Sequence, residues 1–80
     1  MKYPIIRITW RDATGVDEGW LDLEDVLKQN LSTIHTVGML IADTDEYVTI
    51  ALSYDEDNKN IAGYLTIPRV CITTIEHLQR

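Results

Sequence analysis

The side chains able to do chemistry in this chain are few and scattered. His35 and His77 are the only histidines, and neither has a nucleophile at a telling spacing. Cys71 is the single cysteine, so it forms no disulfide within the chain. No phosphate-binding loop, dinucleotide fingerprint, nucleophile elbow or zinc motif occurs. We therefore expect surface or partly buried histidines, a packed thiol, no cofactor and no enzymatic activity.

Acidic residues gather in two short segments, 43–46 (Asp-Thr-Asp-Glu) and 55–57 (Asp-Glu-Asp). Carboxylate oxygens grouped in this way could bind a hard cation such as Ca²⁺. Neither segment has the glycine at position six and the glutamate at position twelve of a calcium-binding loop. We expect solvated turns rather than a metal site.

Aromatic side chains are the remaining candidates. Trp10 and Trp20 flank a polar loop, and Trp20 could pin a helix onto a sheet with its indole N–H facing water. Alternatively, both tryptophans could anchor a protein interface. We expect the packing role for both. Aromatics in strands either stack on nucleic-acid bases or simply suit strand geometry, and four tyrosines lie in or beside predicted strands: Tyr3, Tyr47, Tyr54 and Tyr64.

The elements that position these residues are mostly strands. Alternating apolar and polar residues predict a half-buried strand over 5–11, with Ile6, Ile8 and Trp10 on one face. Gly38 lies within a later strand and indicates a bend or a close backbone approach. The remaining segments rich in β-branched and aromatic residues are predicted strands: 33–42, 47–54, 61–67 and 70–75.

One short helix is predicted after the first strand, over 23–30. Asp22 is a suitable N-cap, and the acidic Glu24 and Asp25 suit the positive end of the helix dipole. Four apolar residues follow at helical spacing: Leu23, Val26, Leu27 and Leu31. A helix this short is marginal alone in water, so we expect it to dock on the sheet.

The order of elements predicts a single domain over residues 1–80. Short connections between successive strands favour antiparallel neighbours, because parallel crossovers need a dozen or more residues. Strongly bent strands in a small chain usually close into a barrel. We therefore predict a mainly β fold, a small five-stranded antiparallel barrel with the helix capping one open end.

The overall charge limits the partners. Thirteen acidic and seven basic residues give a net charge of −6, which opposes non-specific binding to nucleic acid and favours basic partners. The longest uncharged run, 30–42, is too short and too polar to cross a membrane. The first residues lack the apolar segment and cleavage site of a signal peptide. We expect a cytoplasmic location.

Two segments resemble motifs of the Sm and Sm-like RNA-binding proteins. Gly-Met-Leu-Ile at 38–41 followed by residues 45–50 is similar to the first motif, and Ile-Pro-Arg at 67–69 stands in the place of the second. The resemblance implies an Sm-like barrel whose strands pair between copies into a ring. It also implies nucleic-acid contacts from the residues at matching positions: Asp45, Tyr47, Thr49 and Arg69.

The chain departs from that family at several positions. Thr49 replaces an asparagine that contacts a base, and Pro68 stands where the arginine of the second motif is expected. A strand before the helix is closer to an SH3-like arrangement. The whole chain also resembles small phage or prophage proteins, for which the location would be the host cytoplasm.

Two functions therefore remain open. The first is an Sm-like homo-oligomer that contacts RNA or single-stranded nucleic acid near Tyr47 and Arg69. The second is an acidic SH3-like module of phage type, which binds or assembles with a protein partner and does not bind nucleic acid. Neither is an enzyme, and neither requires a metal or a membrane.

Overall fold

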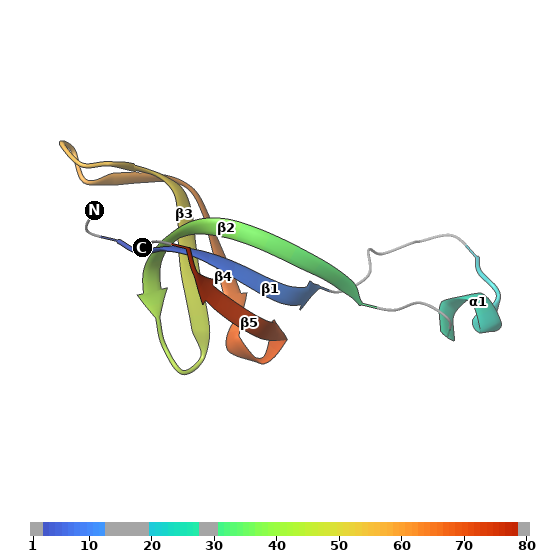
Figure 1. The fold of residues 1–80 in the computed structure, drawn as a ribbon. Helices are drawn as coiled ribbons and strands as arrows, with labels where there is room; N and C mark the ends of the chain where they lie inside the picture. Colours follow the sequence, from blue (N-terminus) through green and yellow to red (C-terminus); the bar gives the residue numbers. More distant parts are fainter. Residues whose placement is uncertain (1–2, 13–19, 28–30, 79–80) are drawn as a thin grey trace.

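The computed structural model describes residues 3–12, 20–27 and 31–78, and five strands dominate it (Figure 1). The predicted mainly β class is confirmed, as is the short helix after the first strand. Along the chain, the elements are β1 (Ile5–Asp12), α1 (Leu23–Leu27), β2 (Ser32–Asp43), β3 (Tyr47–Asp55), β4 (Asn60–Pro68), the 3₁₀ helix η1 (Arg69–Cys71) and β5 (Ile72–His77).

The strands form one sheet in the order β4-β3-β2-β1-β5, and every neighbouring pair is antiparallel. Pairing of β1 with β5 places the start of β1 beside the end of β5 (Figure 1). The sheet is curled but not closed, since β4 and β5 are its two edges among the described strands. The structure therefore contains the five antiparallel strands that we predicted, in an open sheet.

The core lies on one face of this curled sheet. Ile6 and Ile8 are fully buried, as the alternation in β1 predicts, and Trp10 on the same face packs against them. The other buried side chains of this cluster come from strands distant in sequence: Val48, Ile50 and Ile67. Burying an isoleucine or valine contributes about 1.5–3 kcal/mol, so this small cluster is the main source of stability.

The long strand β2 pairs with two other strands. Its first part pairs with β1 and its last part with β3, and the register shifts between Leu40 and Ala42. Gly38 lies at the change of partner, where a Cβ would be 2.8 Å from the carbonyl oxygen of Ala51. Only glycine allows β2 and β3 to approach this closely. The bend or close approach expected at Gly38 is therefore confirmed.

The hairpin between β3 and β4 is closed by Asp55. Its Oδ1 accepts hydrogen bonds from the amides of Asp57 (3.1 Å) and Asn58 (3.3 Å), and its Oδ2 accepts one from the Asn58 side chain (2.9 Å). These bonds, the one from the Asn58 side chain first, lower the pKa of Asp55 below its usual value. The acidic segment 55–57 is therefore part of a hydrogen-bonded turn.

The expected position of the helix is wrong. α1 lies away from the sheet, beyond the far end of the paired strands β1 and β2 (Figure 1), and every described residue of α1 is exposed. The physical reason is the β1–β2 pairing, which continues as far as Asp12 opposite Ser32 and so places α1 beyond the sheet. Residues 28–30, predicted to continue the helix, lie outside the described residues.

The last predicted strand begins later than expected. Residues 69–71 form η1, and β5 starts at Ile72 rather than at Val70. Pro68 ends β4, and the single 3₁₀ turn then carries the chain from one edge of the sheet to the other. Val70 is 93% exposed, so its β-branched side chain contributes nothing to the core.

Candidate functional site

The residues singled out by the Sm-like resemblance lie near one end of the sheet, where the β2–β3 turn meets η1. The amide of Arg69 donates to the carbonyl of Glu46 (2.8 Å), and its Nε donates to the carbonyl of Thr44 (3.2 Å). Its Nη2 also forms an ion pair with Asp43. Segments about 25 residues apart in sequence are thus joined by one guanidinium group.

The turn itself is shaped by Thr44. Its hydroxyl accepts hydrogen bonds from the amides of Glu46 (3.2 Å) and Tyr47 (3.1 Å), and its own amide donates to the carbonyl of Tyr47 (2.9 Å). Sequence reasoning did not single out this threonine. The available signal was a hydroxyl residue at the start of a turn, where it can satisfy the local backbone.

Tyr47 and Thr49 occupy the same face of β3. Tyr47 is opposite Pro68, the residue before Arg69, and is 39% exposed. Thr49 is partly buried, and its hydroxyl lies 2.8 Å from that of Thr66 on β4. The structure therefore places Tyr47 opposite the residue that precedes Arg69, whereas Thr49 is engaged with the neighbouring strand.

The electrostatics of this end are unfavourable for phosphate. Asp43, Asp45 and Glu46 are exposed around the Arg69 guanidinium, so carboxylates outnumber the cation. Binding of a nucleic-acid backbone rests on cations that neutralise phosphates. Arg69 is already occupied by a carboxylate and a backbone carbonyl. The ring of Tyr47 remains as a surface on which a base could stack.

The residues that could act in catalysis lie apart. His35 is exposed, with its Nδ1 3.0 Å from the hydroxyl of Thr9. Cys71 is partly buried and packs against the core, which agrees with the expected packed thiol. Within residues 3–12, 20–27 and 31–78, no group of three or more histidine, cysteine or acidic residues could hold a metal ion. None of the helices described there is long and apolar enough to cross a membrane.

The two tryptophans have different surroundings. Trp10 packs against the core, and its Nε1 donates to the hydroxyl of Thr36 (3.0 Å), which agrees with the expected packing role. Trp20 is fully exposed, so the expectation that it pins the helix to the sheet is wrong. Its neighbours around α1 are exposed too, and we define the apolar arm by these residues: Trp20, Leu21, Leu23, Val26, Leu27 and Leu31.

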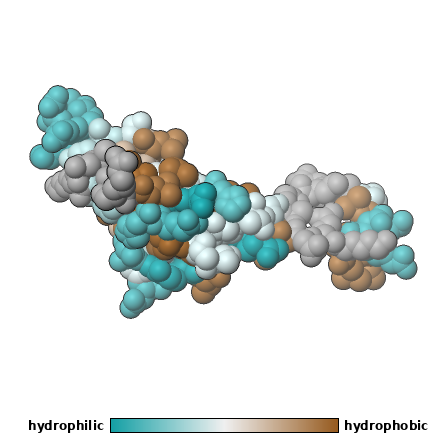
Figure 2. Space-filling model, in the orientation of Figure 1, coloured by the Kyte–Doolittle hydropathy of each residue, from teal (hydrophilic) through white to brown (hydrophobic). Residues whose placement is uncertain are grey.

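The apolar arm is prominent on the surface. Leu23 and Leu27 are 71% and 73% exposed, and hydrophobic side chains project at this end of the molecule in Figure 2. The helix backbone starts at Asp22, whose carbonyl accepts from the amides of Asp25 (3.1 Å) and Val26 (3.2 Å). The sequence predicts this apolar stripe, but the expectation that it docks on the sheet is wrong.

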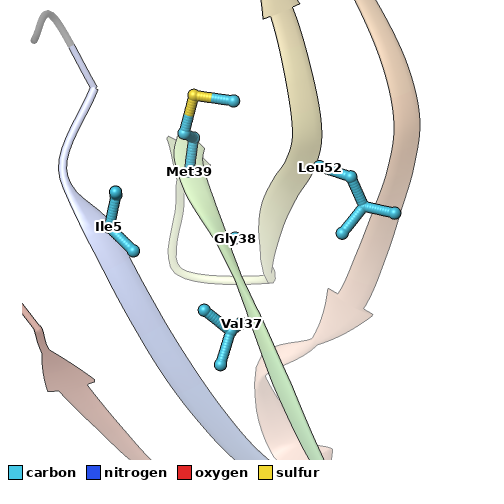
Figure 3. A pocket seen from close by; sticks show the side chains of 5 residues that line it. All are labelled: Ile5, Val37, Gly38, Met39 and Leu52. Atoms are coloured by element: carbon cyan, nitrogen blue, oxygen red, sulfur yellow. The ribbon is translucent and has the colours of Figure 1, made fainter.

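A second apolar surface lies on the other part of the molecule. Five residues line a pocket of about 300 Å³, which we call the apolar pocket (Figure 3): Ile5, Val37, Gly38, Met39 and Leu52. Ile5, Val37 and Met39 occupy odd positions of β1 and β2, on the face opposite the buried Ile6 and Ile8. None of the five lining residues belongs to the buried core cluster.

Comparisons with protein-family models, with curated proteins and with solved structures find no match to this chain. Function is therefore inferred from the surfaces of the molecule, chiefly the apolar arm, the apolar pocket and the turn beside Arg69.

Proposed function

We propose that this chain is a non-catalytic protein-interaction or assembly module that acts in the cytoplasm. The observation that carries the proposal is the apolar arm, in which Trp20, Leu23 and Leu27 are each more than 70% exposed. Soluble monomers rarely leave a contiguous apolar surface of this kind uncovered, and such surfaces mark interaction sites. Exposed tryptophan is also among the residues that most often dominate binding energy in protein interfaces.

The charge distribution supports a protein partner over a nucleic acid. The net charge is −6, and the one arginine near Tyr47 is already paired with Asp43. A phosphate backbone approaching this end would meet Asp45 and Glu46 as well. Repulsion between these groups and phosphate would offset the contribution of a single stacking tyrosine.

A second candidate is an Sm-like homo-oligomer that assembles into a ring and contacts RNA or single-stranded nucleic acid. Two observations favour it. The edges β4 and β5 are available for pairing between copies, and Tyr47 is exposed beside Arg69. In this candidate Tyr47 stacks on a base and Asp45 and Arg69 support it, while Thr49 lies further along the strand.

Two measurements separate the candidates. Fluorescence anisotropy with labelled oligouridine and single-stranded DNA at near-physiological salt is expected to detect no binding at micromolar protein. Tight binding that is lost in both Tyr47→Ala and Arg69→Ala would support the second candidate instead.

The second measurement places a photoreactive amino acid at Leu27 in the cells that produce the protein. We expect a covalent adduct with protein that resists nuclease treatment. The same group at Val70, which is 93% exposed and lies outside the apolar arm, is the matched control. Equal labelling from both positions, or adducts with nucleic acid alone, would contradict the proposal.

A further inference from the structure

We infer that the apolar arm of one chain docks in the apolar pocket of a second copy of the same chain. The inference rests on the proposed function and names its partner and its binding surface. It joins two apolar surfaces of the molecule, at opposite ends of the paired strands β1 and β2.

The lining of the apolar pocket favours an apolar side chain as its occupant. Small-molecule sites combine apolar walls with a few converging polar side chains, which fix the ligand. This pocket is lined by four aliphatic or thioether side chains and a glycine. Its volume of about 300 Å³ is at the lower limit for small-molecule sites. Trp20 or a leucine of the apolar arm matches this chemistry better than a metabolite does.

The geometry of the chain keeps Leu27 out of its own pocket. The carbonyl of Leu31 is held by the Arg11 guanidinium (3.0 Å), at the arm end of the paired strands. Leu27 is only four residues from Leu31, so the two lie within about 14 Å of each other. From Leu31 to Val37, the nearest pocket residue on β2, the strand extends a further 20 Å or so, at about 3.3 Å per residue. A second copy has no such restriction.

One cation lies beside the pocket, and three carboxylates lie beside the arm. The start of the helix carries Asp22, Glu24 and Asp25, all exposed. Arg7 lies opposite Val37 in the sheet and shares the outer face of β1 with Ile5. Its side chain pairs with Glu76 (2.6 Å) yet stays 44% exposed. A docked helix would bring its acidic first turn toward this guanidinium, which already pairs with Glu76.

The area required also favours a reciprocal pair of contacts. Burying Trp20, Leu23 and Leu27 removes on the order of 400 Å² from water. A stable interface buries about 800 Å² on each partner. In a two-fold dimer each chain contributes one arm and one pocket, so the contact forms twice. Two such contacts double this area and reach the size of a weak, reversible interface, whereas one does not.

Light scattering on a sizing column, over a range of concentrations, tests the inference on the full chain. We expect a dimer, with roughly a tenfold or larger rise in its dissociation constant for Leu27→Asp in the arm and for Leu52→Asp in the pocket. Both positions are more than 60% exposed, so neither change should unfold the chain. Val70→Asp adds the same charge outside both surfaces and should leave the dimer unchanged.

Disulfide trapping between separate chains identifies the contact directly. In a Cys71→Ala background, a tagged chain with Leu27→Cys is mixed with an untagged chain carrying Leu52→Cys under mild oxidation. We expect a mixed disulfide dimer, and little product when the second chain carries Thr73→Cys on β5 instead. If Cys71→Ala reduces folding, the light-scattering series is sufficient alone.

Three results would overturn the inference. They are a wild-type monomer at all concentrations, an oligomer that survives both Leu27→Asp and Leu52→Asp, and an oligomer that depends on the arm but not on the pocket. If the photoreactive group at Leu27 captures a different protein while the chain remains monomeric, this inference fails and the proposed function stands. If Leu27 captures nothing and the chain is monomeric, both fail.

Discussion

The core of the sheet and the apolar arm contain the same kinds of residue in opposite environments. Ile6 and Ile8 have no exposed surface, whereas Leu23 and Leu27 are more than 70% exposed. In the core, β1 pairs with the two neighbouring strands β2 and β5, and three further buried residues complete the cluster. The apolar arm has no such neighbour in the described part of the chain. An apolar stripe thus identifies a face that needs a partner, without identifying the partner.

The largest expected effect follows directly from this contrast. Ile50→Ala leaves a cavity in the core and should lower the free energy of unfolding by about 2–5 kcal/mol. Leu27→Ala should change it by no more than about 0.5 kcal/mol, because the side chain is exposed in the single chain. Urea unfolding followed by circular dichroism, at concentrations where the chain is monomeric, measures both. A comparable loss in Leu27→Ala would show that the arm packs on its own sheet.

Gly38 provides the next test, since it controls how closely β2 and β3 approach. In Gly38→Ala the new methyl group would lie 2.8 Å from the carbonyl oxygen of Ala51, so the backbone must shift. We expect a loss of about 1–3 kcal/mol, and Tm should fall by about 4–8 °C for each kcal/mol. Thr33→Ala, on the exposed part of the same strand, is the control. An unchanged Tm would mean that the two strands are further apart in solution.

Arg69 is intermediate in exposure between the core and the apolar arm, since its side chain is 39% exposed. A double-mutant cycle with Arg69→Ala and Asp43→Ala should give a coupling energy of about 0.2–1 kcal/mol, because water and salt screen the pair. Arg69→Ala should cost more than Asp43→Ala, since it also removes the hydrogen bond to the carbonyl of Thr44. Thermal unfolding at low and high salt measures both. A coupling energy that does not change with salt would contradict this screening.

The smallest effect is expected at the tip of the β3–β4 hairpin. The Asn58 side chain, then the Asn58 and Asp57 amides, lower the pKa of Asp55 below 3.8. A folded-state pKa below the unfolded value means that these bonds stabilise the turn above pH 3.8 and are lost as pH falls through the lowered pKa. NMR titration of the Asp57 and Asn58 amides should show this transition. In Asp55→Ala it should be absent, and in Asn58→Ala it should move to higher pH.

The sequence predicts most of the sheet because strand signals are local. Alternation in β1 identifies Ile6 and Ile8 as core residues, and Gly38 identifies the bend in β2. The last two residues of η1 resemble the start of a strand because Val70 is β-branched, but the chain must there cross from β4 to the other edge of the sheet. That requirement depends on strand order, which no local pattern contains.

Some features of the candidate sites follow from the sequence, whereas others depend on the folded structure. The meeting of Arg69 with the β2–β3 turn follows the motif resemblance, whereas the role of Thr44 depends on hydrogen bonds that its residue type only permits. The exposure of Trp20 could not be predicted from the neighbouring residues. A tryptophan that packs a helix onto a sheet and one that anchors an interface can have the same residues around them in the sequence. The apolar pocket combines residues from three strands and depends on the bend of β2.

The pairing of Asp12 with Ser32 has a consequence for engineering and for evolution. These residues face each other across an antiparallel ladder, a separation that a two-residue turn such as Asn-Gly can close. The segment between them can therefore be exchanged without altering the register of the five strands. The sheet is in this sense a display scaffold, on which the inserted segment can diversify while the supporting strands stay the same.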